Sequence, residues 1–148
     1  MKLSLDTTIL VDLDRKDKTT IEVLKTLLSE GHDIFISTVV PSEIFTGAYL
    51  REDYKTATAK VRRLITRFEI VPLNAAIAET IGQINAYLII NGLPIEYPDV
   101  AIAATFISKG GDFLLTKNKR HFLNIPKLKD KVFTPAEFKE KGLMQTQS

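Results

Sequence analysis

The stretch Lys2-Leu3-Ser4-Leu5-Asp6-Thr7-Thr8 is a short apolar run that ends on a carboxylate. Leu3 and Leu5 alternate with polar residues, and a second apolar run follows at 9–11, so the pattern predicts a strand that opens directly into a helical turn. An aspartate at the carboxyl end of a buried strand lies where open α/β sheets hold ligands. Asp and Thr are also common helix N-caps, so other residues must decide between the two interpretations.

The composition indicates one globular domain. The chain has 148 residues, of which 45% are hydrophobic and 26% charged, enough for one core and too few for two ordinary domains. We predict a single domain over 1–141 and a disordered tail over 142–148. No apolar run is as long as a membrane span and no signal peptide is visible, so we expect a cytoplasmic protein.

The side chains available for metal binding are mostly oxygen donors. The sequence has no cysteine and two histidines, which excludes disulfides and makes a thiolate or histidine-rich zinc site a poor candidate. Oxygen ligands favour Mg²⁺ or Mn²⁺.

Strand-like and helix-like segments alternate along the chain. After the first strand we expect strands near 33–37, 70–73, 112–116 and 132–133, with helices between them and one after the last. Thr19 with Glu22 matches a capping box for the first long helix, and Pro72 suggests either an edge strand or the end of a strand. This alternation predicts an α/β fold of three layers, with a central parallel sheet between helices.

Three carboxylates fall at equivalent positions in this predicted fold. Asp6 follows the first strand, and Glu43 and Asp99 each fall in the first turn of a later helix. Such positions face one edge of a parallel sheet, where Thr116 and Asn118 also arrive. Clustered carboxylates repel one another unless a cation lies between them, and a Mg²⁺ ion bound there would suit phosphodiester hydrolysis.

Four motifs carry a resemblance to a known family. They resemble the successive motifs of PIN-domain ribonucleases, most closely those of VapC toxins from toxin–antitoxin pairs. The residues concerned are Leu5-Asp6-Thr7-Thr8-Ile9-Leu10, Ser37-Thr38-Val39-Val40-Pro41-Ser42-Glu43, Asp99-Val100-Ala101-Ile102-Ala103-Ala104-Thr105 and Leu115-Thr116-Lys117-Asn118-Lys119-Arg120-His121-Phe122.

The resemblance implies a Mg²⁺- or Mn²⁺-dependent endoribonuclease that acts as the toxin of a type II toxin–antitoxin pair. It implies that Asp6 and Asp99 bind the metal and that Glu43 is the third acid. It also implies a homodimer and a VapB-like antitoxin partner. For the antitoxin groove, the candidates are Ile44, Phe45, Ala48 and Tyr49, although an apolar helix face can equally be plain core packing.

The chain departs from the family pattern at two positions. Thr8 stands where Asn or Ser is usual and keeps a hydroxyl group. His121 stands where a fourth acid is usual, and a neutral imidazole is a poor ligand for a hard cation, so a second metal position is in doubt. Glu96 could supply the missing charge, whereas Asp112 precedes its strand and should lie at the opposite edge.

The remaining roles complete the expected ribonuclease site. Thr116 and Asn118 would order the catalytic acids, and the RNA backbone would be contacted by Lys117, Lys119, Arg120 and His121. His121 could instead be a partly exposed helix residue. Two alternatives stay open, a PIN-type nuclease of RNA maturation and a catalytically weak RNA-binding module. A receiver-type signalling domain is disfavoured because no aspartate follows the strand at 70–73.

Overall fold

The computed structural model describes residues 1–142 and centres on one parallel sheet. Its strands are β1 (Lys2–Leu5), β2 (Asp33–Ser37), β3 (Glu69–Val71), β4 (Phe113–Leu115) and β5 (Val132–Phe133). They are ordered β3-β2-β1-β4-β5, and each neighbouring pair is parallel. The predicted parallel sheet is therefore confirmed, with β3 at an edge.

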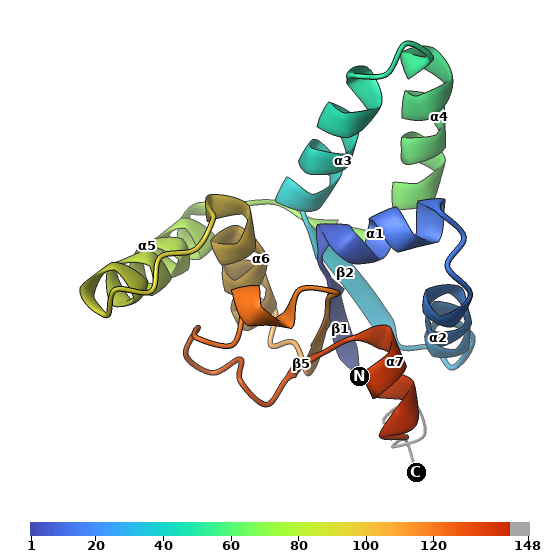
Figure 1. Ribbon diagram of the computed structural model, residues 1–148. Helices are drawn as coiled ribbons and strands as arrows, with labels where there is room; N and C mark the ends of the chain where they lie inside the picture. Colours follow the sequence, from blue (N-terminus) through green and yellow to red (C-terminus); the bar gives the residue numbers. More distant parts are fainter. Residues whose placement is uncertain (143–148) are drawn as a thin grey trace.

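Helices cover both faces of this sheet (Figure 1). Helices α5 and α6 lie on one face and α1, α2 and α7 on the other, while α3 and α4 form a hairpin that stands away from the sheet. This arrangement gives the three predicted layers. The helices are α1 (Thr7–Asp14), α2 (Lys18–Ser29), α3 (Val39–Tyr49), α4 (Tyr54–Ile65), α5 (Ala75–Ile90), α6 (Tyr97–Ser108), α7 (Pro135–Glu140) and the short 3₁₀ helix η1 (Lys119–His121).

Strand β1 and helix α6 occupy the centre of the core. Leu3 and Leu5 are fully buried. Helix α6 is buried almost all round, since each residue from Val100 to Phe106 is shielded from solvent. This explains its run of alanines, which lets the helix pack closely in the interior. No helix within 1–142 has both the length and the apolar character needed to cross a membrane.

The strand order creates a switch point between β1 and β4. The chain leaves β1 toward β2 on one side, and β4 joins β1 from the other side. Open α/β sheets hold ligands in the crevice at the carboxyl ends of such strands. Leu5 pairs with Leu115 in the parallel register, so the next residues, Asp6 and Thr116, emerge together at this crevice.

The start of α2 differs from the prediction. The capping box of Thr19 with Glu22 is wrong, because α2 begins at Lys18 and Asp17 is its N-cap. The Asp17 carboxylate accepts a hydrogen bond from the amide N of Thr20 at 3.1 Å. A carboxylate is the stronger acceptor, so the helix begins about half a turn earlier than the threonine pattern indicates.

Glu43 lies one turn deeper in its helix than predicted. Helix α3 begins at Val39, which places Glu43 in its second turn rather than its first. The helix starts early because Thr38 already follows β2 in a helical conformation.

At the other end of the chain, Gly142 lies in a turn after α7, and 143–148 of the predicted tail lie outside the described residues.

Candidate active site

Asp6 is buried at the end of β1 and accepts hydrogen bonds on both carboxylate oxygens. Its Oδ1 accepts from the Thr8 hydroxyl at 2.5 Å and from the amide N of Ile9 at 3.3 Å. Its Oδ2 accepts from the Thr116 hydroxyl at 2.5 Å. The Ile9 bond is the N-cap of α1, so Asp6 does cap the helix. It also gathers two side-chain donors that a cap does not need.

The two hydroxyl groups are themselves held by backbone amides. The Thr8 hydroxyl oxygen accepts from the amide N of Lys117, and the Thr116 hydroxyl oxygen from that of Asn118, both at 2.9 Å. Because each hydroxyl accepts from an amide, its own hydrogen is directed at Asp6. The segment 116–118 thus keeps Asp6 as a double acceptor, which suits an ionised carboxylate.

Burial nevertheless raises the pKa of Asp6 to about 6. The hydrogen bonds from Thr116 and Thr8 oppose this shift, whereas the charge of Asp99 adds to it. A buried anion beside a second acid is costly without a positive charge nearby. The electrostatics of the site therefore favour a bound cation.

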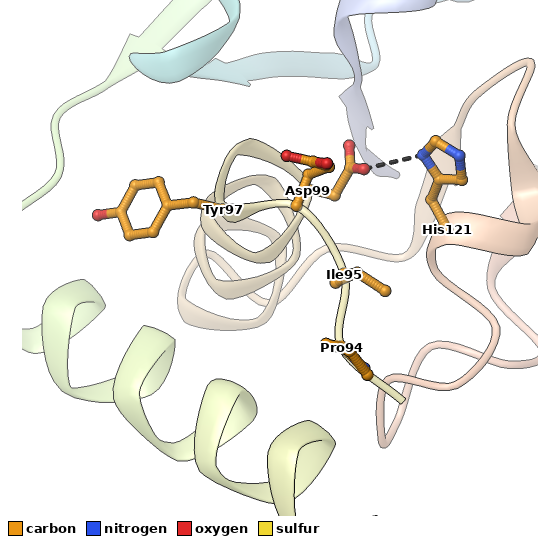
Figure 2. A pocket seen from close by; sticks show the side chains of 6 residues that line it. Pro94, Ile95, Tyr97, Asp99 and His121 are labelled. Atoms are coloured by element: carbon orange, nitrogen blue, oxygen red, sulfur yellow. Dashed lines mark hydrogen bonds and ion pairs between the residues drawn. The ribbon is translucent and has the colours of Figure 1, made fainter. Parts of the chain in front are cut away.

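Asp99 lies in the first turn of α6 and is paired with His121. The Nδ1 of His121 lies 2.8 Å from Oδ2 of Asp99 (Figure 2). The Asp99 side chain is 17% exposed and that of His121 47%. Partial burial raises the pKa of Asp99, the contact with His121 lowers it, and the charges of Glu43 and Glu96 raise it. At the position where the family pattern has a fourth acid, this chain therefore has His121, whose imidazole contacts the carboxylate of Asp99.

Glu43 approaches the same edge from α3. It is exposed and accepts a hydrogen bond on Oε1 from the Thr7 hydroxyl at 2.5 Å. Its charge acts on Asp99, so the structure brings the three predicted acids into one electrostatic cluster. Sequence reasoning missed Thr7, although its position directly after Asp6 placed it at this edge.

A cavity of about 500 Å³ opens beside Asp99. Figure 2 shows Asp99 between Tyr97 and His121, with Pro94 and Ile95 below them. Glu96 also lines the cavity and, at the N-cap of α6, makes no side-chain cap bond.

Asp112 lies at the opposite edge of the sheet, as predicted. Its Oδ2 accepts a hydrogen bond from the amide N of Lys2, the first residue of β1, at 2.8 Å.

The acidic cluster fits a hydrated divalent cation better than a closed protein cage. Within 1–142, no three acidic or histidine side chains are placed closely enough to surround an ion by themselves. Mg²⁺ commonly uses only one or two carboxylates and keeps several waters. Asp6 and Asp99 supply that donor set, with Glu43 within electrostatic reach.

The predicted RNA-contacting cations differ in how far they are already engaged. Lys119 Nζ lies 2.9 Å from Oε2 of Glu137, and Lys117 Nζ lies 3.2 Å from Oδ2 of Asp12. Arg120 is exposed, and its guanidinium makes no ion pair within the part of the chain that the structure describes. Lys119 therefore ties η1 to α7, while Arg120 remains available to an anion.

The four groove candidates point to two different places. Ile44 and Ala48 line a cleft of about 320 Å³ between α1, α3 and α4. Phe45 and Tyr49 do not line it, and their rings lie 6.4 Å apart, with Tyr49 stacked on Tyr54. The structure thus separates the predicted set into a cleft-lining pair and an aromatic pair.

Comparisons with known proteins agree with this architecture. No curated protein matches in sequence. Among solved structures, VapBC2 from Rickettsia felis, bound to a promoter DNA fragment, matches with a TM-score of 0.81 and 26% identity over 90% of this chain and 98% of that one. DNA-bound VapBC from Salmonella typhimurium gives the same score and identity over 91% and 98%.

A more distant structure shares the fold alone. VapC20 of Mycobacterium tuberculosis, a Sarcin-Ricin loop cleaving toxin, matches with a TM-score of 0.60 and 16% identity over 85% of this chain and 98% of that one. The family model of the PIN domain matches residues 3–128. That match spans β1 to η1 and all three acids of the cluster, and the chain therefore belongs to the PIN domain family.

Proposed function

We propose that this protein is a Mg²⁺- or Mn²⁺-dependent endoribonuclease that acts as the toxin of a toxin–antitoxin pair. The observation that carries the proposal is the buried Asp6, held as a double acceptor by Thr8 and Thr116, with Asp99 and Glu43 at the same sheet edge. This cluster is suited to hold a cation against phosphate oxygens. The similarity to VapBC structures supports the toxin role.

In the proposed hydrolysis, the side chains of the site have three tasks: binding the ion, orienting Asp6 and accepting a proton. Asp6 and Asp99 would hold the ion, which when bound activates water and stabilises the oxyanions of an in-line displacement. Thr8 and Thr116 keep Asp6 an acceptor. Glu43 is exposed and can accept the proton of the attacking water, whose oxygen forms a bond to phosphorus as the bond to the leaving ribose oxygen breaks; that oxygen then takes a proton from solvent.

The proposal is tested by incubating purified protein with a mixed RNA pool in Mg²⁺, in Mn²⁺ and in chelator. Asp99→Asn is the active-site variant, and Asp112→Asn is the matched control at the opposite edge. We expect metal-dependent cleavage by the wild type and the control, and none by Asp99→Asn. Equal cleavage in chelator, or by Asp99→Asn, would contradict a metal-dependent site at Asp99.

The pairing of Asp99 with His121 favours one second candidate, a weak RNA-binding module. The imidazole engages an oxygen that a metal could otherwise use, which would lower metal affinity. RNA binding without cleavage in either metal, by protein shown to be free of any antitoxin, would support this candidate over the nuclease.

We also propose a homodimer and a VapB-like antitoxin as partners. Ile89 and Ile90 at the end of α5 are 70% and 81% exposed, and such apolar surface is typical of an interface. The cleft at Ile44 and Ala48 adjoins Glu43, so an antitoxin segment bound there would lie beside the acids. Light scattering gives the molecular mass of the wild type and of Ile90→Glu in solution. We expect a dimer for the wild type and a larger share of monomer for Ile90→Glu, because a glutamate charge disfavours burial in an interface.

A further inference from the structure

The contact between His121 and Asp99 limits where a cation can bind. The charges of both Glu43 and Glu96 act on Asp99, and the two acids line different hollows: Glu43 lines the cleft of α1, α3 and α4, and Glu96 lines the cavity beside Asp99. Asp6 and Glu43 reach it from β1 and α3. Glu96 lines the cavity of about 500 Å³ that Asp99 and His121 also line. By charge alone, Asp99 could therefore share one ion with Asp6 and a second ion, on the side of the cavity, with Glu96.

His121 closes the second of these positions. Its Nδ1 lies 2.8 Å from Oδ2 of Asp99 (Figure 2), so the imidazole occupies that oxygen at the cavity that both residues line. A Mg²⁺ ion needs its oxygens at about 2.1 Å in near-octahedral geometry, and it cannot share the space of an N–H donor. Within 1–142, Oδ1 of Asp99 makes no hydrogen bond and stays available for an ion shared with Asp6.

The other ring nitrogen does not offer a substitute position. Nε2 lies across the imidazole from the atom that faces Asp99, so an ion bound there would lose Asp99 as a ligand. No group of three acidic or histidine side chains in the described chain surrounds such a position. Hard cations also prefer oxygen to imidazole nitrogen.

We propose that His121 is a positioning residue that fixes Asp99 and closes the cavity-side cation position, so that each chain binds a single divalent ion. The inference rests on the proposed function, since it takes the Asp6 and Asp99 pair as the metal site. It assigns to His121 a role in metal stoichiometry rather than direct contact with the reacting phosphate.

The test is a Mn²⁺ titration of full-length protein, read as unbound Mn²⁺ by electron paramagnetic resonance and as bound metal by equilibrium dialysis. Wild type, His121→Asp, His121→Asn and Arg120→Asp are compared. His121→Asp replaces the donor by a ligand, and His121→Asn keeps an N–H donor. Arg120→Asp adds a carboxylate at the neighbouring exposed position of η1, which does not line the cavity beside Asp99.

We expect about one ion per chain for the wild type, His121→Asn and Arg120→Asp, and about two for His121→Asp. Two ions in the wild type would overturn the inference and leave the proposed nuclease intact. One ion in His121→Asp, or two in Arg120→Asp, would overturn it as well. Failure of the wild type to bind any ion saturably would instead remove the metal site on which the proposed function depends.

His121 is half exposed, so these variants should fold, and circular dichroism at several temperatures verifies that they do. Asp99→Asn provides the remaining control. It should abolish saturable binding in the wild-type background, which locates the single ion at Asp99.

Discussion

The strand pair β1 and β4 carries an aspartate at each of its two edges, and the two residues have opposite surroundings. At the amino edge, Asp112 is exposed, and its carboxylate accepts from one backbone amide, that of Lys2, at 2.8 Å. At the carboxyl edge, Asp6 is 3% exposed and is held by two hydroxyl groups and a backbone amide beside a second acid.

This contrast separates a structural carboxylate from a reactive one. Asp112 keeps contact with water and joins two strands, so its charge has a low cost. Asp6 loses contact with water, which raises its pKa, and the charge of Asp99 raises it further, whereas the hydrogen bonds to Asp6 oppose the rise. The buried charge of Asp6 therefore lowers the stability of the folded protein at the carboxyl edge, and such a destabilising group is typical of functional sites.

The largest expected difference between the two edges is in catalysis. Asp6→Asn should lower the rate of metal-dependent RNA cleavage about 10³-fold, because it removes a charge that holds the cation against the transition state. Asp112→Asn should change the rate by less than about twofold. Rates on one defined RNA, with folding verified by circular dichroism, make the comparison. Equal losses at both edges would show that the effect is not specific to the site.

The second difference is in the stability of the metal-free protein. The folded-state pKa of Asp6, about 6, lies above its ordinary value of 3.8, so folding favours the protonated form. The resulting penalty is fully present above pH 6 and disappears as the pH falls below 3.8. Asp6→Asn should therefore raise the free energy of unfolding by on the order of 1–3 kcal/mol at pH 7.5 and by little at pH 3.5.

Urea unfolding of the wild type and both aspartate variants at the two pH values, in chelator, measures this effect. Asp112→Asn should not stabilise the protein at pH 7.5, because the Asp112 carboxylate is solvated. Added Mg²⁺ should stabilise the wild type and have less effect on Asp6→Asn. A destabilised Asp6→Asn at neutral pH would contradict the electrostatic argument.

A smaller effect is expected from the hydroxyl groups around Asp6. Thr116→Val keeps the shape of the side chain but removes a bond that lowers the pKa of Asp6. The pKa should rise further, so protons compete with Mn²⁺ at higher pH and cleavage at pH 7 falls about tenfold. The Mn²⁺ affinity measured between pH 5 and 8 reports this shift of the pKa. Thr116→Ser keeps the hydroxyl group and should restore the wild-type pH dependence. An unchanged pH profile in Thr116→Val would refute this role.

The smallest effect concerns the cations beside the site. Arg120→Ala should weaken RNA binding about threefold at low salt and reduce the salt dependence, as for the loss of one phosphate contact. Lys119→Ala should leave affinity nearly unchanged, because its ammonium is bound to Glu137 and lies over the Phe133 ring. Fluorescence anisotropy with a labelled RNA and catalytically inactive protein separates the two. A larger loss for Lys119→Ala would reverse the assignment.

Local patterns were sufficient to predict the layers of the fold and the edge at which the acids meet. The alternation of strands and helices, Pro72 after the edge strand and the position of Asp112 before β4 all follow from near neighbours in the chain. The start of α2 was wrong because two adjacent capping patterns compete there, and the carboxylate of Asp17 is the better acceptor.

The pairings within the site could not be predicted in this way. His121 meets Asp99 across 22 positions and Thr7 meets Glu43 across 36, and both contacts depend on how separate helices are oriented. The engagement of Lys119 by Glu137 likewise depends on the return of α7. The sequence pattern predicted which residues reach the edge but not which of them bind one another.

The bond from Thr116 to Asp6 also has a consequence for the order of events during synthesis. It joins residues 110 positions apart, and a ribosome releases the amino-terminal part of a chain first. A nascent chain that already contains β1, β2 and β3 has Asp6 but neither Thr116 nor His121. The growing chain therefore cannot assemble the proposed cation site until Asp99 and β4 have been made and β4 has paired with β1.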